Sequence, residues 1–437
     1  MLYRKIEKTI INHLQNNDTI LVVDGARQVG KTFIIREVIN KLYDNVIEIN
    51  FLEDSLNDQI FKNIKTVKDF YFQLSMLYGH KMDKKENTII FIDEIQEYKE
   101  FISLLKFLKQ DNKFTYIASG TLLGVTLSKI KSIPMGSIKV IRMYPLDFEE
   151  FLYANGANEY FISELNYKFK NGESLDEKAH DKLMDLFKKY LLVGGLPDAV
   201  KSYIDDYNIF KIRKFQTETK NYYVEDASKY DEQNKLKIKR IYELIPSNLE
   251  NKKKRIIVKN IENINGKRYS DYIDEFDYLI NAGISLDVKA ISNPTFPLIQ
   301  SSSKNLLKLY LNDVGLFTNI LYKNNIKAIM DNQNSINLGS VYETVVAQEL
   351  KAHGHTLFYY DNRHNGEVDF LLDDYDNLSV LPIEVKSGKD YQIHSALNKL
   401  LSNKEYNINK GIVLSNEREI KTNNNIVYMP IYYIMFL

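Results

Sequence analysis

The sequence predicts an α/β protein whose first part is a doubly wound parallel sheet. Three apolar runs typical of buried parallel strands, at 20–23, 46–51 and 88–92, alternate with segments of helical periodicity. A loop bounded by glycines, 25–30, joins the first run to a helix that begins near Lys31. Strands that alternate with helices form a parallel sheet, and ligands bind at the carboxyl ends of its strands.

The glycine-bounded loop matches the phosphate-binding pattern G-x-x-x-x-G-K-[ST]. The predicted nucleotide-binding residues are Gly25, Ala26, Arg27, Gln28, Val29, Gly30, Lys31 and Thr32. Glycines let backbone N–H groups converge on phosphate oxygens, and the following helix adds the positive end of its dipole. We expect Lys31 to reach the β- and γ-phosphates and to assist catalysis, and Thr32 to hold Mg²⁺. The alternative is a glycine turn that only closes a strand–helix unit, which leaves the Lys-Thr pair unexplained.

A second part of this site is predicted where the third apolar run ends in Asp93 and Glu94. We expect Asp93 to hold Mg²⁺ through water, and Glu94 to orient and deprotonate the attacking water. The alternative is an acidic strand end that faces solvent. Ser119 ends the next strand, and we expect it beside Asp93 as a catalytic sensor of the γ-phosphate. Thr121 is the second choice for this role, or else a helix N-cap.

Composition limits the classes of function. The 437 residues predict two to four domains at roughly 150 residues per domain. With 58 basic and 58 acidic residues the net charge is zero, so any DNA contact must use local patches. The chain has no cysteine, which excludes disulfides and cysteine-ligated metal sites. No apolar run approaches the ~20 residues that span a bilayer, so we predict a cytoplasmic protein without a membrane partner.

Three motifs together resemble the prokaryotic AAA+ superfamily ATPases that carry a C-terminal domain of unknown function. These motifs are 25–32, 91–96 and 143–151. The likeness continues through 191–197, 309–316 and the C-terminal motifs, and so covers nearly the whole chain. It implies ATP as the nucleotide and a P-loop ATPase core, which we expect in residues 1–155.

The chain departs from this family at one place. Many relatives have Gly-Arg before the third motif, where this chain has Gly136-Ser137. If that arginine acts on the γ-phosphate, its role is vacant here or has moved to Arg142 or Lys139. Arginine fingers supplied by a neighbouring subunit are common in AAA+ assemblies, so an oligomer is an open alternative.

The middle of the chain is predicted to be helical at first. Residues 156–230 resemble the small helical lid of AAA+ proteins, with an apolar helix face that ends at a Gly-Gly-Leu-Pro stop signal, 194–197. That signal is either a helix cap or a hinge that senses nucleotide. Residues 231–330 are predicted to be winged-helix-like, with helices followed by a strand pair. Their basic run, 252–255, either meets DNA phosphates or is a solvated loop.

Residues 331–437 are predicted to form a smaller α/β domain with its own site. Glu343 lies on a predicted helix, Asp369 on a strand, and Glu384 and Lys386 on the next strand. Residues two apart on a strand face the same side, so Glu384 and Lys386 project together. We expect Asp369 and Glu384 to bind Mg²⁺ or Mn²⁺, Glu343 to complete the metal shell, and Lys386 to activate water.

These motifs resemble the PD-(D/E)XK nuclease fold. The alternative is a surviving fold with a buried Glu–Lys ion pair and no cleavage. The whole chain is thus predicted to be a Mg²⁺-dependent ATPase coupled to a nuclease-like domain that cuts or binds DNA. Another hypothesis is an ATP-dependent switch or scaffold that does not cleave and acts by binding nucleic acid or a protein partner. A third is a regulator in which ATP controls the winged helix.

Overall fold

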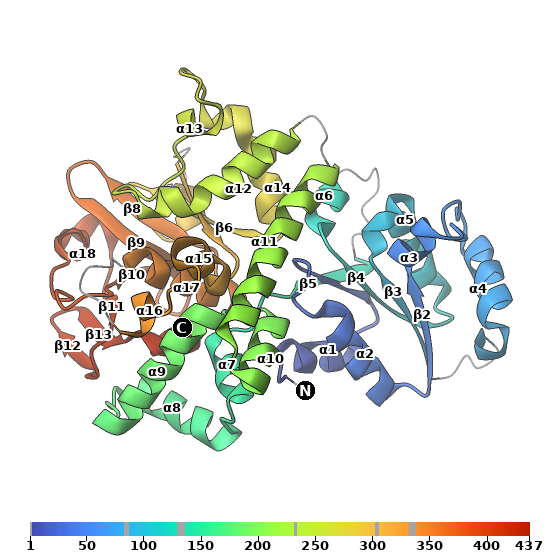
Figure 1. The fold of residues 1–437 in the computed structure, drawn as a ribbon, viewed down its shortest axis with the longest axis horizontal. Coiled ribbons are helices and arrows are strands. Elements are labelled where there is room, and N and C mark those ends of the chain that lie inside the picture. Colours follow the sequence, from blue (N-terminus) through green and yellow to red (C-terminus); the bar gives the residue numbers. More distant parts are fainter. Residues whose placement is uncertain (1, 83–86, 129–135, 231–233, 302–305, 332–337) are drawn as a thin grey trace. The chain divides into compact units, whose positions relative to one another are not determined.

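A computed structural model describes residues 2–82, 87–128, 136–230, 234–301, 306–331 and 338–437. The chain divides into two compact units (Figure 1). We call residues 3–144 with 281–283 the N-terminal unit, and Leu2, 145–280 and 284–437 the C-terminal unit. The expected boundaries at 155 and 330 fall inside the C-terminal unit, and the one at 231 lies outside the described residues. The four expected domains therefore stay a prediction.

The N-terminal unit is built on a five-stranded sheet in the order β2-β3-β4-β1-β5, and all its pairings are parallel. The strands are β1 (Ile20–Asp24), β2 (Asn45–Asn50), β3 (Thr88–Asp93), β4 (Thr115–Gly120) and β5 (Ile138–Arg142). Every residue of β1 and β3 is buried, as their continuous apolar runs predict. The parallel α/β sheet expected for this part of the chain is confirmed.

Helices pack on this sheet. They are α1 (Ile6–Asn16), α2 (Lys31–Leu42), α3 (Phe51–Leu56), α4 (Val67–Met82), η1 (Ile95–Glu97), α5 (Lys99–Asp111) and α6 (Leu123–Ser128). One apolar core joins α3, α4 and α5 to the sheet and includes Phe101. The Phe101 ring meets Phe51 and Phe70 edge to face, each with a centroid distance of 4.9 Å. This core holds the carboxyl ends of β2 and β3 in place.

The C-terminal unit contains a mixed eight-stranded sheet in the order β12-β13-β11-β10-β9-β8-β6-β7. The strands are β6 (Ser285–Ile291), β7 (Leu307–Leu311), β8 (Phe358–Asn362), β9 (Gly366–Asp374), β10 (Ser379–Val385), β11 (Gly411–Ser415), β12 (Lys421–Asn423) and β13 (Ile426–Pro430). The strand expected within 282–288 as part of a wing is β6, and it belongs to this sheet, because it pairs with both β7 and β8. A separate winged-helix domain is therefore not confirmed.

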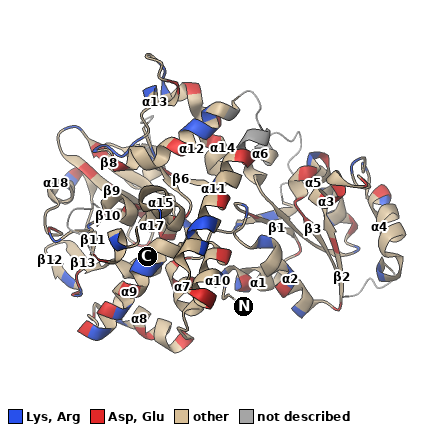
Figure 2. Cartoon of the chain, viewed as in Figure 1, with Lys and Arg blue, Asp and Glu red and all other residues tan. Residues whose placement is uncertain are grey.

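The helices of the C-terminal unit precede and flank that sheet. They are α7 (Phe148–Ala154), α8 (Glu159–Asn171), α9 (Glu177–Val193), α10 (Pro197–Asp206), α11 (Ile209–Tyr230), α12 (Lys235–Glu250), α13 (Lys259–Glu262), η2 (Tyr269–Tyr272), α14 (Ile273–Asn281), η3 (Leu298–Ser301), α15 (Val314–Tyr322), α16 (Lys327–Met330), α17 (Gly339–Ala352), α18 (Ser395–Ser402), η4 (Lys404–Tyr406) and η5 (Ile431–Phe436). Basic and acidic residues are interspersed along surface helices such as α9 (Figure 2). Within the described residues, no helix combines the length and apolar character that crossing a membrane requires.

The Gly-Gly-Leu-Pro stop signal lies against a buried carboxylate. Gly194 ends α9 with φ 71°, and a Cβ there would lie 2.2 Å from Oδ1 of Asp313. The N–H of Gly195 donates to Oδ2 of Asp313 at 2.6 Å, and the N–H of Leu316 donates to Oδ1 at 3.0 Å. Asp313 thus joins the end of α9 to the start of α15. Burial raises the pKa of Asp313 to about 6, and these backbone N–H donors oppose the rise.

Candidate functional site

The loop between β1 and α2 requires glycine at both of its ends. A Cβ on Gly25 would lie 2.3 Å from the carbonyl oxygen of Met143. Gly30 has φ 93° at the N-cap of α2, and Gln28 has φ 65°. Glycine adopts a positive φ without strain, as at Gly30, whereas Gln28 must be held in such a conformation by its surroundings. The sharp bend leaves the backbone curled in front of the N-terminus of α2, which is the geometry that binds phosphate.

Lys31 lies inside this loop. Its Nζ donates to the carbonyl oxygens of Gly25 at 3.0 Å and Ala26 at 2.9 Å, and its side chain is buried. Burial lowers the pKa of the Lys31 ammonium, while neighbouring carboxylates, led by Glu94, oppose that shift. The chain therefore holds this ammonium among loop carbonyls, beside acidic groups.

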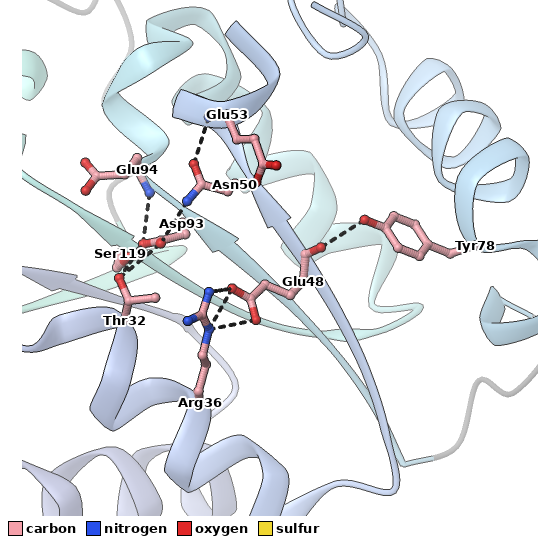
Figure 3. Close-up of polar contacts among 9 residues, drawn as sticks. All are labelled: Thr32, Arg36, Glu48, Asn50, Glu53, Tyr78, Asp93, Glu94 and Ser119. Carbon is pink, nitrogen blue, oxygen red and sulfur yellow. Dashed lines mark hydrogen bonds and ion pairs between the residues drawn. The ribbon is translucent and has the colours of Figure 1, made fainter. Parts of the chain in front are cut away.

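Asp93 ends β3 and receives hydrogen bonds from three uncharged side chains (Figure 3). Thr32 Oγ1 donates to both carboxylate oxygens, at 3.1 and 3.0 Å, and Ser119 Oγ donates to Oδ1. Asn50 Nδ2 donates to Oδ2 at 3.3 Å. Burial raises the pKa of Asp93, and the hydrogen bond from Ser119 is the largest opposing effect. The predicted site residues Thr32, Asp93 and Ser119 are thus brought together.

Glu94 follows Asp93 in a left-handed conformation, with φ 53°. Its Oε2 accepts from Gln96 Nε2 at 2.5 Å and from Thr121 Oγ1 at 3.2 Å. Gln96 is buried, and its Oε1 accepts from the N–H of Thr121 at 3.0 Å. A residue in left-handed conformation is costly unless its surroundings hold it, and such residues cluster at functional sites. Gln96 and Thr121 supply that support here.

The sequence analysis did not predict two residues that contact this site, Asn50 and Gln96. Asn50 pairs with Asp93 in register at the carboxyl ends of β2 and β3, so its position after an apolar run was the signal. Gln96 lies two residues after Glu94, and its place directly after the Asp93-Glu94 pair was the signal there.

The expected substitutes for the absent arginine lie on β5. Arg142 is held by Asp24, with Nε and Nη2 at 3.1 and 2.9 Å from Oδ2. Burial alone would lower the pKa of Arg142, but Asp24 outweighs it and the pKa is raised. Lys139 is exposed. Arg142 is therefore a partner of the residue that precedes the loop, and an action on phosphate stays a prediction for either residue.

The four predicted residues of the C-terminal site also lie together. Lys386 Nζ is 2.8 Å from Oε1 of Glu384, and the N–H of Val385 donates to Oδ2 of Asp369 at 2.8 Å. Burial raises the pKa of Asp369 well above its usual range, and the neighbouring carboxylates of Glu343 and Glu384 raise it further. We call this group, with the cations described next, the carboxylate cluster.

Lysines that the sequence analysis did not assign to this site complete the carboxylate cluster. Lys254 Nζ forms an ion pair with Oε1 of Glu343, and Tyr310 donates its hydroxyl to Oε2 at 3.0 Å. Lys308 is fully buried and lies 2.5 Å from Oε1 of Glu367. Burial alone would raise the pKa of Glu343, but Lys254 and Lys308 outweigh it and the pKa is lowered. A lysine inside the apolar run of β7 was the signal for Lys308.

The two sites differ in how well their residues fit a metal ion. The glycine loop, Thr32 and Asp93 fit a nucleotide with Mg²⁺, because the loop curls in front of the N-terminus of α2 and the Asp93 carboxylate accepts from the hydroxyl of Thr32 and the amide of Asn50. The carboxylate cluster does not fit a metal as it stands, because lysines and a tyrosine already bind Glu343 and Glu384. Across the described residues, no group of three or more histidine or acidic side chains is arranged to hold a metal ion.

Three family models match consecutive parts of the chain. Residues 17–152 match the model described as an AAA domain. Residues 184–327 and 338–434 match two models described as domains of unknown function, DUF8612 and DUF4143. The chain therefore contains an AAA-type P-loop ATPase domain, as the sequence motifs predict. The nuclease fold expected for residues 331–437 is not confirmed, since the model that matches there names no activity.

Relatives and solved structures add distant likenesses. The uncharacterized protein MJ1544 of Methanocaldococcus jannaschii is 26% identical over 364 residues, which are 81% of this chain and 72% of that protein. An uncharacterized protein of Haemophilus influenzae is 25% identical over 193 residues, 43% of this chain and 41% of that protein. The Walker-type ATPase PABY2304 of Pyrococcus abyssi superposes with a TM-score of 0.44 at 14% identity, over 73% of this chain and 95% of that one.

Proposed function

We propose that the N-terminal unit hydrolyses ATP with the help of Mg²⁺. The observation that carries this proposal is the pairing of a phosphate-binding loop with a buried carboxylate, Asp93, that accepts hydrogen bonds from the side chains of Thr32, Asn50 and Ser119. Mg²⁺ bound with ATP neutralises charge on the β- and γ-phosphate oxygens. Thr32 and Asp93 would hold it, and the loop N–H groups and Lys31 would bind the phosphates.

Glu94 is the proposed general base. Gln96 and Thr121 hold its Oε2, so the carboxylate has a defined position beside Asp93. In that position Glu94 can orient a water and accept its proton as it attacks the γ-phosphate. Ser119 Oγ donates to the Asp93 carboxylate. We propose that this contact places Ser119 where it can sense the γ-phosphate.

The test is ATP hydrolysis by the full chain and its Lys31→Ala variant. Loss of the loop ammonium removes charge stabilisation of the transferred phosphoryl group, so we expect turnover to fall by about 10²-fold or more. Lys41→Ala is the matched control, because Lys41 lies on the same helix and is exposed. Turnover by Lys31→Ala within about twofold of wild type would contradict the proposal, since mutation of a phosphate-binding lysine has a large effect.

We further propose that the C-terminal unit is a non-cleaving output, as in an ATP-dependent switch or scaffold. The observation that favours this function over a nuclease is that lysines pair with the carboxylates expected to bind metal. Assays of DNA nicking with Mg²⁺ and with Mn²⁺ test it, using wild type and Asp369→Ala. We expect wild type to nick DNA no more than Asp369→Ala does. Nicking by wild type that Asp369→Ala abolishes would contradict a non-cleaving C-terminal unit. DNA, protein and oligomer partners and a cytoplasmic location stay predictions.

A further inference from the structure

Arg4 is a buried cation that the proposed mechanism does not use. It lies just before α1 and is only 6% exposed. Its Nη1 donates to the carbonyl oxygen of Val29 at 2.9 Å, and its Nη2 donates to that of Tyr144 at 2.6 Å. Val29 belongs to the glycine loop, and Tyr144 follows β5. One guanidinium therefore joins the start of the N-terminal unit to the loop and to the segment after β5.

The bond to Val29 fixes the peptide that leads into α2. A trans peptide points its N–H opposite to its C=O, so a held Val29 carbonyl also sets the direction of the Gly30 N–H. Gly30 is the N-cap of α2 and has φ 93°, and glycine changes conformation at little cost. The next peptide is held by the helix, because the N–H of Ile34 donates to the Gly30 carbonyl at 3.1 Å. Arg4 thus holds the last peptide before the helix.

The second acceptor of Arg4 is itself fixed against the loop. The N–H of Met143 donates to the carbonyl of Asp24, just before the loop begins, at 2.7 Å. The Met143 carbonyl lies so close that a Cβ on Gly25 would come within 2.3 Å of its oxygen. Tyr144 is the next residue, so its carbonyl gives Arg4 an acceptor whose position relative to the loop is fixed.

A charge at this place has a consequence beyond the two hydrogen bonds. Burial of a guanidinium costs free energy, and carbonyl acceptors only partly restore what water supplied. Holding a loop in shape does not by itself require a charged side chain. A chain of phosphates carries several negative charges, so a cation bonded to the loop attracts it, and the attraction is stronger where water is excluded.

We propose that Arg4 positions the phosphate site: it holds the Val29 carbonyl so that the Gly30 N–H faces the β-phosphate of a bound nucleotide, and its charge adds to the attraction. This inference rests on the nucleotide binding proposed above. In this role Arg4 acts through the peptide between Val29 and Gly30 and does not itself touch the phosphate. Its loss should therefore weaken the binding of ADP as well as that of ATP.

The test is calorimetric titration of the full chain with ADP in the presence of Mg²⁺. Arg4→Met keeps the approximate length of the side chain and removes its charge and its donors, so we expect the Kd for ADP to rise by about tenfold or more. Arg4→Lys keeps the charge, but an ammonium lacks the fork that spans two carbonyls, so its Kd should rise by about threefold.

His13→Leu is the matched control for these variants. His13 lies on α1, is buried, and donates from Nε2 to the carbonyl oxygen of Thr19 at 2.8 Å. The substitution therefore removes a buried hydrogen bond to the backbone of the same unit without touching the glycine loop. The Kd of His13→Leu for ADP should stay at the wild-type value.

Thermal unfolding separates the positioning of the loop from the cohesion of the fold. Both Arg4→Met and His13→Leu should melt below wild type without nucleotide, because each loses a buried hydrogen bond. A fixed concentration of ADP should raise the melting temperature of His13→Leu as much as that of wild type, and that of Arg4→Met by less, because the rise depends on affinity. If Arg4→Met does not fold, Arg4→Lys carries both measurements.

The outcomes distinguish this proposal from the function on which it rests. If wild type binds no ADP, the function proposed for the N-terminal unit fails, and the role of Arg4 fails with it. If wild type binds ADP and the Arg4 variants bind it equally well, or if His13→Leu loses as much affinity as Arg4→Met, only the role of Arg4 is overturned. Failure of both Arg4 variants to fold would also overturn it, since a positioning role leaves the fold intact.

Discussion

Two of the chain's buried carboxylates, one in each unit, have partners of opposite kinds. Asp93 in the N-terminal unit meets the hydroxyls of Thr32 and Ser119 and the amide of Asn50. Glu343 in the C-terminal unit meets the ammonium of Lys254. Neutral donors orient the Asp93 carboxylate without adding a charge of their own, whereas the ammonium of Lys254 pairs directly with the Glu343 carboxylate.

This difference decides what each site can bind. A buried carboxylate with neutral partners retains an attraction for a cation, so Asp93 suits Mg²⁺. A buried carboxylate with a lysine partner has already replaced its lost hydration by an ion pair. We therefore expect a buried acidic residue to serve a ligand in the N-terminal unit and internal cohesion in the C-terminal unit.

Glu94→Gln tests whether the N-terminal carboxylates do chemistry. The amide keeps the shape of the side chain but cannot accept a proton, so we expect ATP turnover to fall by about 10²- to 10⁴-fold with ATP binding retained. Turnover and nucleotide affinity of the purified variant are the measurements. Glu100→Gln is the control, because Glu100 is exposed on α5. A small loss, similar to that of the control, would mean that Glu94 is not the base.

Glu343→Gln tests whether the C-terminal carboxylates hold the fold together. The variant leaves Lys254 without its charged partner, so we expect the free energy of unfolding to fall by about 3 kcal/mol with ATP turnover unchanged. Denaturant unfolding measures it. The control is Glu48→Gln, which breaks the exposed ion pair with Arg36 drawn in Figure 3 and should cost at most about 1 kcal/mol. Equal costs for the two variants would remove the contrast.

Asp313 tests, through the pH dependence of stability, what burial does to a carboxylate that is paired with backbone N–H groups. Its pKa is raised to about 6 on folding, so the folded state binds this proton more tightly than the unfolded state. The contribution of Asp313 to the free energy of unfolding is present at about pH 4 and is lost as the pH rises through about 6. The whole loss is about 3 kcal/mol. The difference in melting temperature between wild type and Asp313→Asn at pH 4, 6 and 8 measures it. A pH-independent difference would contradict it.

Gln96→Ala tests the support of Glu94. Gln96 is a positioning residue, since it acts through Oε2 of Glu94. We expect about a tenfold loss in kcat with little change in KM, because a misplaced base slows the step without weakening binding. If the amide donor of Gln96 is what matters, Gln96→Asn, which keeps an amide, should lose less kcat than Gln96→Glu, which does not. An effect on KM alone would assign Gln96 to binding instead.

Much of the first unit could be predicted from the sequence because its signals are local. The glycine loop, the apolar strand runs and the Asp93-Glu94 pair each lie within a few residues of the chain. The C-terminal site was only partly predictable. Glu384 and Lys386 are two residues apart, but Lys254 reaches Glu343 from 89 residues away. The pairing of β6 with β8 could not be predicted for the same reason, because β8 lies far along the chain.

The sequence by itself determined a phosphate-binding loop, a parallel sheet and two sets of acidic residues, because dihedral preference and hydrophobic periodicity act over short distances. Only the tertiary structure decided which partners those acidic residues receive. Thr32, Asn50 and Ser119 converge on Asp93 because parallel strands end at one edge of a sheet. Lys254 reaches Glu343 because its segment is bonded to β7, and that pairing sets the charge of the C-terminal site.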